Sequence, residues 1–169
     1  MAEYSISKWK NTLWSRKTGN WATPRDFYKF LDDRFHFTLD PCPLNADFNG
    51  LDMEWSGSVY VNPVYRYTKL WVAKAFKELS DCSVIVFNIP ARTDTKLFHE
   101  KILPFASEIW FIKGRLKFGT LYDEQGKNLN TSAPLPSMIV VFRPPLTERK
   151  ETSWFMWYNE VGVIFNRND

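Results

Sequence analysis

Cysteine and histidine are scarce in this chain, with two of each among its 169 residues. The two cysteines, Cys42 and Cys82, cannot build a disulfide framework or a four-ligand zinc site. The two histidines, His36 and His99, add little material for a metal site, and we expect both to be structural. The sequence therefore predicts a protein without a bound metal.

Long apolar runs are also missing, and none approaches the roughly 18 residues that a bilayer-spanning helix needs. The N-terminal stretch MAEYSISKWKNTLW carries charges and aromatic rings where a secretion signal would have an apolar segment. We therefore expect a cytoplasmic protein, in the host cell if it is phage-encoded. Because there is no repeat, low-complexity tract or Gly/Ser linker, 1–169 is predicted to form a single domain, with 1–20 as a basic and aromatic arm.

Apolar and aromatic residues are what the chain does have. Hydrophobic residues make up 44% and charged residues 24%, which is ordinary globular composition and excludes a disordered protein. Aromatic residues reach 17%, which suits either a core built from rings or the stacking of nucleic-acid bases. The net charge of +3 permits a polyanionic partner without requiring one.

Apolar spacing along the chain predicts helices alternating with strands. A helix is expected from Thr23, its N-cap, and Pro24 in its first turn, because Phe27 and Leu31 follow at helical spacing. This order favours an α/β fold with a mostly parallel sheet, whose last two strands form an antiparallel hairpin across the polar loop 113–135. Further helices are expected over 70–79 and 95–103, and strands over 36–40, 58–61, 83–89, 108–112 and 137–142.

Polar residues follow three of these expected strands. Asp40 ends the first, Asn62-Pro63 follows the second, and Asn88 near Arg92 closes the third. In open α/β sheets the working site lies beyond the carboxyl ends of the strands. These residues are therefore the candidate walls of a site.

Six separated stretches, in the same order, resemble the phage and prophage DNA N6-adenine methyltransferase (Dam-like) family. The resemblance implies a trimmed Rossmann-like methyltransferase sheet, S-adenosylmethionine as cofactor and DNA as substrate. It covers roughly 16–145 and leaves 146–169 unmatched. The stretches are TGNWATP (18–24), FTLDPCPLN (37–45), VNPVY (61–65), IPARTDT (89–95) with FH (98–99), IKGRLKF (112–118) and APLPSMIVVFRP (133–144).

The resemblance assigns catalysis to Asn62, Pro63 and Tyr65. The exocyclic amine of adenine is a poor nucleophile, because its lone pair is delocalised into the ring. Acceptors for both amine protons, here the Asn62 side-chain oxygen and the Pro63 carbonyl, would free that lone pair. Tyr65 would stack on the flipped base, a contact worth about 1–3 kcal/mol. Val64 departs from the family pattern, which has a second proline there, and we expect a less rigid loop.

The resemblance also implies a cofactor site, with Asp40 accepting from the ammonium group of the methionine part. Asn49 departs from the family, which tends to have an acid at that position, and Asp47 or Asp52 could substitute. The residues expected at the cofactor are Trp21, Thr23, Pro24, Asp40, Pro41 and Cys42.

Three basic residues, Arg92, Arg115 and Lys117, are expected to contact DNA; the alternative is a charged strand edge exposed to solvent. Two other functions stay open: a catalytically silent DNA- or partner-binding protein on the same fold, and a cytosine-N4 methyltransferase. All the enzymatic readings require Asp40 and Asn62 to lie at one shared pocket.

Overall fold

The computed structural model describes residues 23–44, 46–116, 133 and 135–148, and the backbone of two short strands within 155–166. The predicted arm 1–20, Trp21, Lys117 and most of the 113–135 loop lie outside the described residues. Within the described parts of the chain, no helix has the length and hydropathy that a membrane-spanning segment needs.

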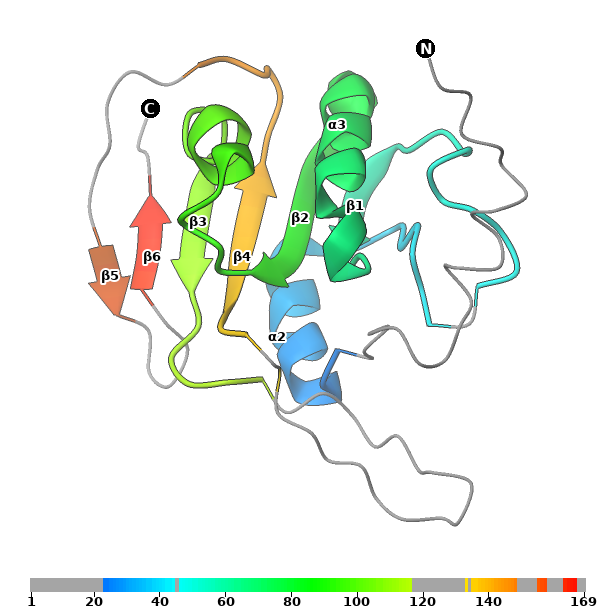
Figure 1. Cartoon of the computed structure of the whole chain (residues 1–169). Helices are drawn as coiled ribbons and strands as arrows, with labels where there is room; N and C mark the ends of the chain where they lie inside the picture. Colours follow the sequence, from blue (N-terminus) through cyan, green and yellow to red (C-terminus); the bar gives the residue numbers. More distant parts are fainter. Residues whose placement is uncertain are drawn as a thin grey trace.

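The centre of the molecule is a six-stranded mixed sheet with the order β1-β2-β4-β3-β6-β5 (Figure 1). Both β2 and β4 are continuous apolar runs, as expected of strands that are covered on both faces. The last two strands come from 146–169, a region in which the sequence pattern predicted no element. The strands are β1 (Gly57–Val61), β2 (Cys82–Pro90), β3 (Glu108–Phe111), β4 (Ser137–Phe142), β5 (Phe155–Trp157) and β6 (Val163–Asn166).

The expectation of a mostly parallel sheet is wrong. Only β1 and β2 form a parallel ladder, whereas the other four ladders are antiparallel. The reason is that β4 inserts between β2 and β3, so β2 and β3 keep the same direction without being neighbours. The predicted antiparallel hairpin of β3 and β4 is confirmed. The result is a mixed α/β fold that is consistent with a trimmed methyltransferase sheet.

Helices cover the sheet on both faces (Figure 1). On one face α2 (Arg25–Phe35) buries three apolar residues at helical spacing against one core cluster. On the other face α3 (Thr68–Glu78) and the π-helix η3 (Phe98–Ile102) cover the second cluster. Two 3-10 helices, η1 (Tyr65–Tyr67) and η2 (Leu79–Asp81), flank α3. The predicted helices over 70–79 and 95–103 correspond to α3 and η3.

Many of the aromatic rings belong to these two clusters. Trp55 is 1% exposed and stacks on Trp71 at a centroid distance of 5.9 Å. Trp110 is 2% exposed and packs against Phe35 at 5.7 Å. For these rings the core interpretation is confirmed.

Two local predictions near the N-terminal side of the sheet are wrong. The predicted strand 36–40 forms only a single parallel bridge, from Leu39 to Val59. Thr23 does not cap α2, because Pro24 occupies the N-cap position and no side chain caps the helix there. His36 ends this helix in the left-handed conformation, with φ at 52°.

Candidate active site

The Asp40 loop and the Asn62 loop lie side by side at the carboxyl edge of the sheet. Leu39 pairs with Val59, and the Tyr60 amide donates to the Leu39 carbonyl at 2.9 Å. This pairing carries the chain that follows Leu39 to the point where β1 ends. There the Cys42 thiol meets the backbone N–H of Asn62. Asp40 and Asn62 therefore lie on neighbouring loops, as every enzymatic reading requires, and a shared pocket between them stays a prediction.

Asp40 is a partly buried carboxylate. Its Oδ1 accepts a hydrogen bond from the Cys42 amide at 2.9 Å, which closes a tight turn around Pro41. Burial raises the pKa of Asp40 to about 6, and the Cys42 amide opposes this shift. No lysine, arginine or histidine of the described residues forms a salt bridge with it. Asp40 is thus an anion placed where a cationic group of a ligand would stabilise it.

Cys42 is not set up as a nucleophile. Burial of its sulfur and the neighbouring Asp40 charge raise the pKa of the thiol well above its usual value. A neutral thiol suits its position as the contact between the two loops.

Asn62, Pro63 and Val64 connect β1 to η1. Pro63 is buried, whereas Asn62 and Val64 keep part of their surface exposed. Val64 has φ at −57° and ψ at 122°, and its carbonyl accepts from the Tyr67 amide at 2.9 Å. A φ of −57° is one that proline itself adopts. The Val64 backbone therefore has a φ that the family's second proline would also adopt.

Tyr65 opens η1 and is half-buried. Burial raises the pKa of its hydroxyl to about 12, and the nearby Ser137 side chain lowers it slightly. Ser137 begins β4, so the Tyr65 ring extends from the end of β1 past β2 toward β4. A ring that spans this edge could cover an inserted base.

A chain of hydrogen bonds runs behind Asn62. The Asn62 Nδ2 donates to the Thr23 Oγ1 at 3.2 Å, and the Thr23 Oγ1 lies 2.6 Å from the Tyr60 hydroxyl. The Asn88 side-chain amide reaches the same hydroxyl at 3.3 Å. Asn88 was predicted to line the site, whereas the position of Tyr60 could not be predicted from the sequence. The sequence shows only that Tyr60 carries a polar atom and lies two residues before Asn62, on the same side of the strand.

The predicted DNA contacts differ in their surroundings. Arg92 forms a two-pronged ion pair with Asp94, at 2.9 Å for both bonds, and this pair holds the pKa of Asp94 at about 2. Arg115 donates to the Ala133 carbonyl at 3.0 Å. Arg92 can therefore bind phosphate only in competition with Asp94, while Lys117 lies outside the described residues.

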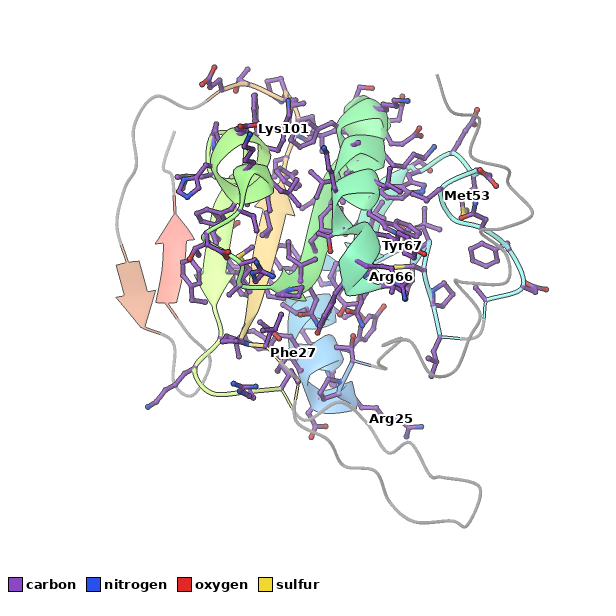
Figure 2. All side chains as sticks on the ribbon, in the orientation of Figure 1. Arg25, Phe27, Met53, Arg66, Tyr67 and Lys101 are labelled. Atoms are coloured by element: carbon purple, nitrogen blue, oxygen red, sulfur yellow. The ribbon has the colours of Figure 1, made fainter. Side chains whose placement is uncertain are left out.

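Arg66 is a further exposed cation that the sequence reasoning missed. It follows Tyr65 directly, and its guanidinium lies 5.5 Å from the centre of the Tyr67 ring. Figure 2 shows Arg66 and Tyr67 next to each other at the N-terminal end of α3, on the side where β1 and β2 end. An exposed cation beside the candidate base-stacking ring is well placed to meet a phosphate.

The departure at Asn49 also has a structural counterpart. The Asn49 Nδ2 donates to the Asp52 carboxylate at 2.8 Å, and its Oδ1 accepts from the Leu51 amide at 3.2 Å. Of the two acids that could substitute, Asp52 is therefore the one that lies against Asn49. Within the described part of the chain, no three potential metal ligands cluster together.

The family model for DNA N-6-adenine-methyltransferase (Dam) matches residues 10–159. No curated protein and no solved structure gives a match. The matched range contains both the Asp40–Cys42 loop and the Asn62–Tyr65 segment, and it covers most of the chain. The chain is therefore a member of the DNA N-6-adenine-methyltransferase (Dam) family.

Proposed function

We propose that this protein transfers a methyl group from S-adenosylmethionine to the N6 amine of an adenine flipped out of DNA. The observation that carries the proposal is the backbone pairing of Leu39 with Val59, in which the Tyr60 amide donates to the Leu39 carbonyl at 2.9 Å. This pairing places the candidate cofactor loop, which follows Leu39, beside the candidate acceptor loop, which follows β1. Donor and acceptor would therefore meet at one edge of the sheet, as a direct transfer requires.

The acceptor loop supplies the chemistry that activates the amine. The Asn62 side-chain oxygen and the Pro63 carbonyl would each accept one amine proton, which shifts the nitrogen toward a tetrahedral, nucleophilic form. Loss of one such contact is expected to lower the rate by about 10²–10³-fold, by analogy with oxyanion-hole donors. Tyr65 would hold the base by stacking, and the few kcal/mol that flipping costs are of similar size.

The described residues fit the cofactor. Asp40 is a partly buried carboxylate without a basic partner in the described chain, which suits the ammonium group of S-adenosylmethionine. When bound, S-adenosylmethionine supplies an electrophilic methyl group on a sulfonium. Pro24, Pro41 and Cys42 would line the same place, and Asp52, beside Asn49, would take the part of the acid that the family pattern has there.

Val64 does not argue against activity. Its φ of −57° keeps the loop in a conformation that proline would also adopt. The cost of valine lies in the greater freedom of the unfolded loop, and Val64→Pro should recover about 0.4–1 kcal/mol of stability.

The test is to incubate the protein with methyl-labelled cofactor and unmodified duplex DNA, then digest the DNA to nucleosides. We expect the label in N6-methyladenine. Asn62→Ala should lower kcat by about 10²–10³-fold. Ser80→Ala should leave kcat unchanged, because Ser80 lies in η2 just before β2 begins, at the other end of the strands from Asn62.

Two other outcomes of this experiment would each support one of the alternative functions. Label in N4-methylcytosine would replace adenine by cytosine as the acceptor. DNA binding without label transfer, by the wild type and by Val64→Pro alike, together with no measurable cofactor affinity in calorimetry, would favour a catalytically silent DNA-binding protein.

A further inference from the structure

The hydrogen bonds behind Asn62 form one continuous chain across three elements. It runs from Asn62 after β1, through Thr23 before α2 and Tyr60 within β1, to Asn88 within β2. Tyr60 and Asn88 are each 1% exposed. Their polar atoms are thus shielded from water and depend on one another for hydrogen bonds.

Both side-chain amides of this chain point their nitrogen at a hydroxyl. The Asn88 Nδ2 donates to Tyr60, and the Asn62 Nδ2 donates to Thr23. Tyr60, which accepts from Asn88, can donate its one proton to the Thr23 Oγ1. A hydroxyl oxygen can accept two hydrogen bonds, so the Thr23 Oγ1 can accept from both Tyr60 and Asn62.

This arrangement is consistent along its length. Tyr60 accepts from Asn88 and can donate to Thr23, and Thr23 accepts from the Asn62 Nδ2. An Asn62 amide turned the other way would place its nitrogen toward the substrate amine, so that two donors would face each other.

We infer that Thr23, Tyr60 and Asn88 are positioning residues that hold the Asn62 amide with its nitrogen inward and its carbonyl oxygen toward the substrate amine. This inference rests on the proposed function for its catalytic meaning. The chain also makes Asn62 a better acceptor, because an amide that donates through its nitrogen carries more negative charge on its oxygen.

The first test removes the Tyr60 hydroxyl with Tyr60→Phe and keeps the ring. We expect kcat to fall by about tenfold, the upper range for one hydrogen bond, with KM for DNA and for S-adenosylmethionine unchanged. Tyr28→Phe is the matched control, because this ring lies 5.0 Å from the Tyr60 ring and has no part in the chain. A fall in kcat that is equal in both variants would overturn the inference.

A second pair of variants separates the hydroxyl from packing. Thr23→Val keeps the shape of the side chain and deletes the hydroxyl that accepts from Asn62, so kcat should fall as in Tyr60→Phe. Thr23→Ser restores the hydroxyl without the methyl group, and should recover most of that loss. If Thr23→Ser is as impaired as Thr23→Val, the methyl group matters rather than the hydrogen bond, and the inference is wrong.

A spectroscopic measurement tests the chain without any activity. In ¹⁵N-labelled protein, the side-chain NH₂ signal of Asn62 is identified by its disappearance in Asn62→Ala. We expect Tyr60→Phe to shift this signal and Tyr28→Phe to leave it in place; an unmoved signal in Tyr60→Phe refutes the inference. If the wild type methylates no DNA while the shift is observed, the proposed function fails and the orientation of Asn62 stands.

Discussion

Gly50 is the residue whose substitution most directly tests the cofactor loop. A Cβ atom added there would lie 1.8 Å from the Pro41 carbonyl oxygen and 2.6 Å from its carbon. Real Cβ atoms essentially never approach a heavy atom within 3.0 Å, so Gly50→Ala must separate the two backbone segments by more than 1 Å. The two nearest atoms of Pro41 belong to its backbone, and the position of the added Cβ is fixed by the Gly50 backbone, so no side-chain rotation can relieve the clash.

The segment around Gly50 is held more firmly than the Pro41 turn. The Gly50 carbonyl accepts from the Trp55 Nε1 at 2.9 Å, and the Trp55 indole is 1% exposed and stacked on Trp71. The Pro41 turn is closed by the hydrogen bond from the Cys42 amide to Asp40. We therefore expect Pro41 to move and to carry the Asp40 carboxylate with it.

Two measurements follow from this displacement. Urea unfolding should show a loss of about 1–3 kcal/mol, as for overpacking in other cores. Calorimetric titration with S-adenosylmethionine should show an affinity lowered by at least about tenfold. A misplacement near 1 Å can lower the rate of a positioned reaction by about 10²-fold, and a displaced Asp40 carboxylate should lose its contact with the cofactor in the same way.

Gly114→Ala is the control for the added methyl group. Gly114 has φ at +80° and nothing lies within 4 Å of its added Cβ. The substitution should cost about 1 kcal/mol of backbone strain and leave cofactor affinity unchanged. A Gly50→Ala protein with wild-type stability and affinity would refute the placement of Pro41 against Gly50.

Three further predictions concern single charged groups. Because burial raises the pKa of Asp40 from 3.8 to about 6, the folded state holds its proton more tightly, so stability should fall as pH rises from about 4 to 6. Urea unfolding should show this loss as up to about 2–3 kcal/mol in the wild type and not in Asp40→Asn. Glu108, which is 8% exposed at its side chain, pairs with two arginines and accepts from the Trp110 Nε1 at 3.1 Å. Glu108→Ala should destabilise the fold by about 2–3 kcal/mol in thermal or urea unfolding, and a change below 0.5 kcal/mol, roughly the size for a neutral surface site, would contradict this account. In DNA titrations over a range of salt, Arg115→Ala should reduce the slope of log K against log salt by about 1, while Arg92→Ala should change it less, because Asp94 already pairs with Arg92.

The sequence predicts those parts of this fold that depend on local pattern. Amphipathic spacing located α2 and α3, and continuous apolar runs located β2 and β4. The rule that sites lie beyond strand ends brought Asp40, Asn62 and Asn88 into consideration before any pairing was known. Each of these inferences needs only the residues within one segment.

Predictions that depend on distant partners were less successful. The alternation in 36–40 suggests a strand, but only Leu39 obtains a bridge partner. No local signal states that β4 inserts between β2 and β3, since that position is decided by the packing of the whole sheet. Thr23 has the residue type of an N-cap, and instead its hydroxyl bonds Tyr60, 37 residues away.

The register between β1 and β2 is what turns separate polar residues into one chain. Tyr60 pairs with Val86 and Val61 with Phe87, so the next positions along both strands are Asn62 and Asn88. Both faces of β2 are covered and mainly apolar, so its hydrophobic pattern is compatible with more than one register against β1. The buried amide of Asn88 favours one of these registers. A slip by one residue would turn its amide toward the α3 face and separate it from Tyr60, and a buried amide left without partners costs about 1–3 kcal/mol. The same side chain that orients Asn62 therefore also favours the one pairing in which Asn62 can be oriented.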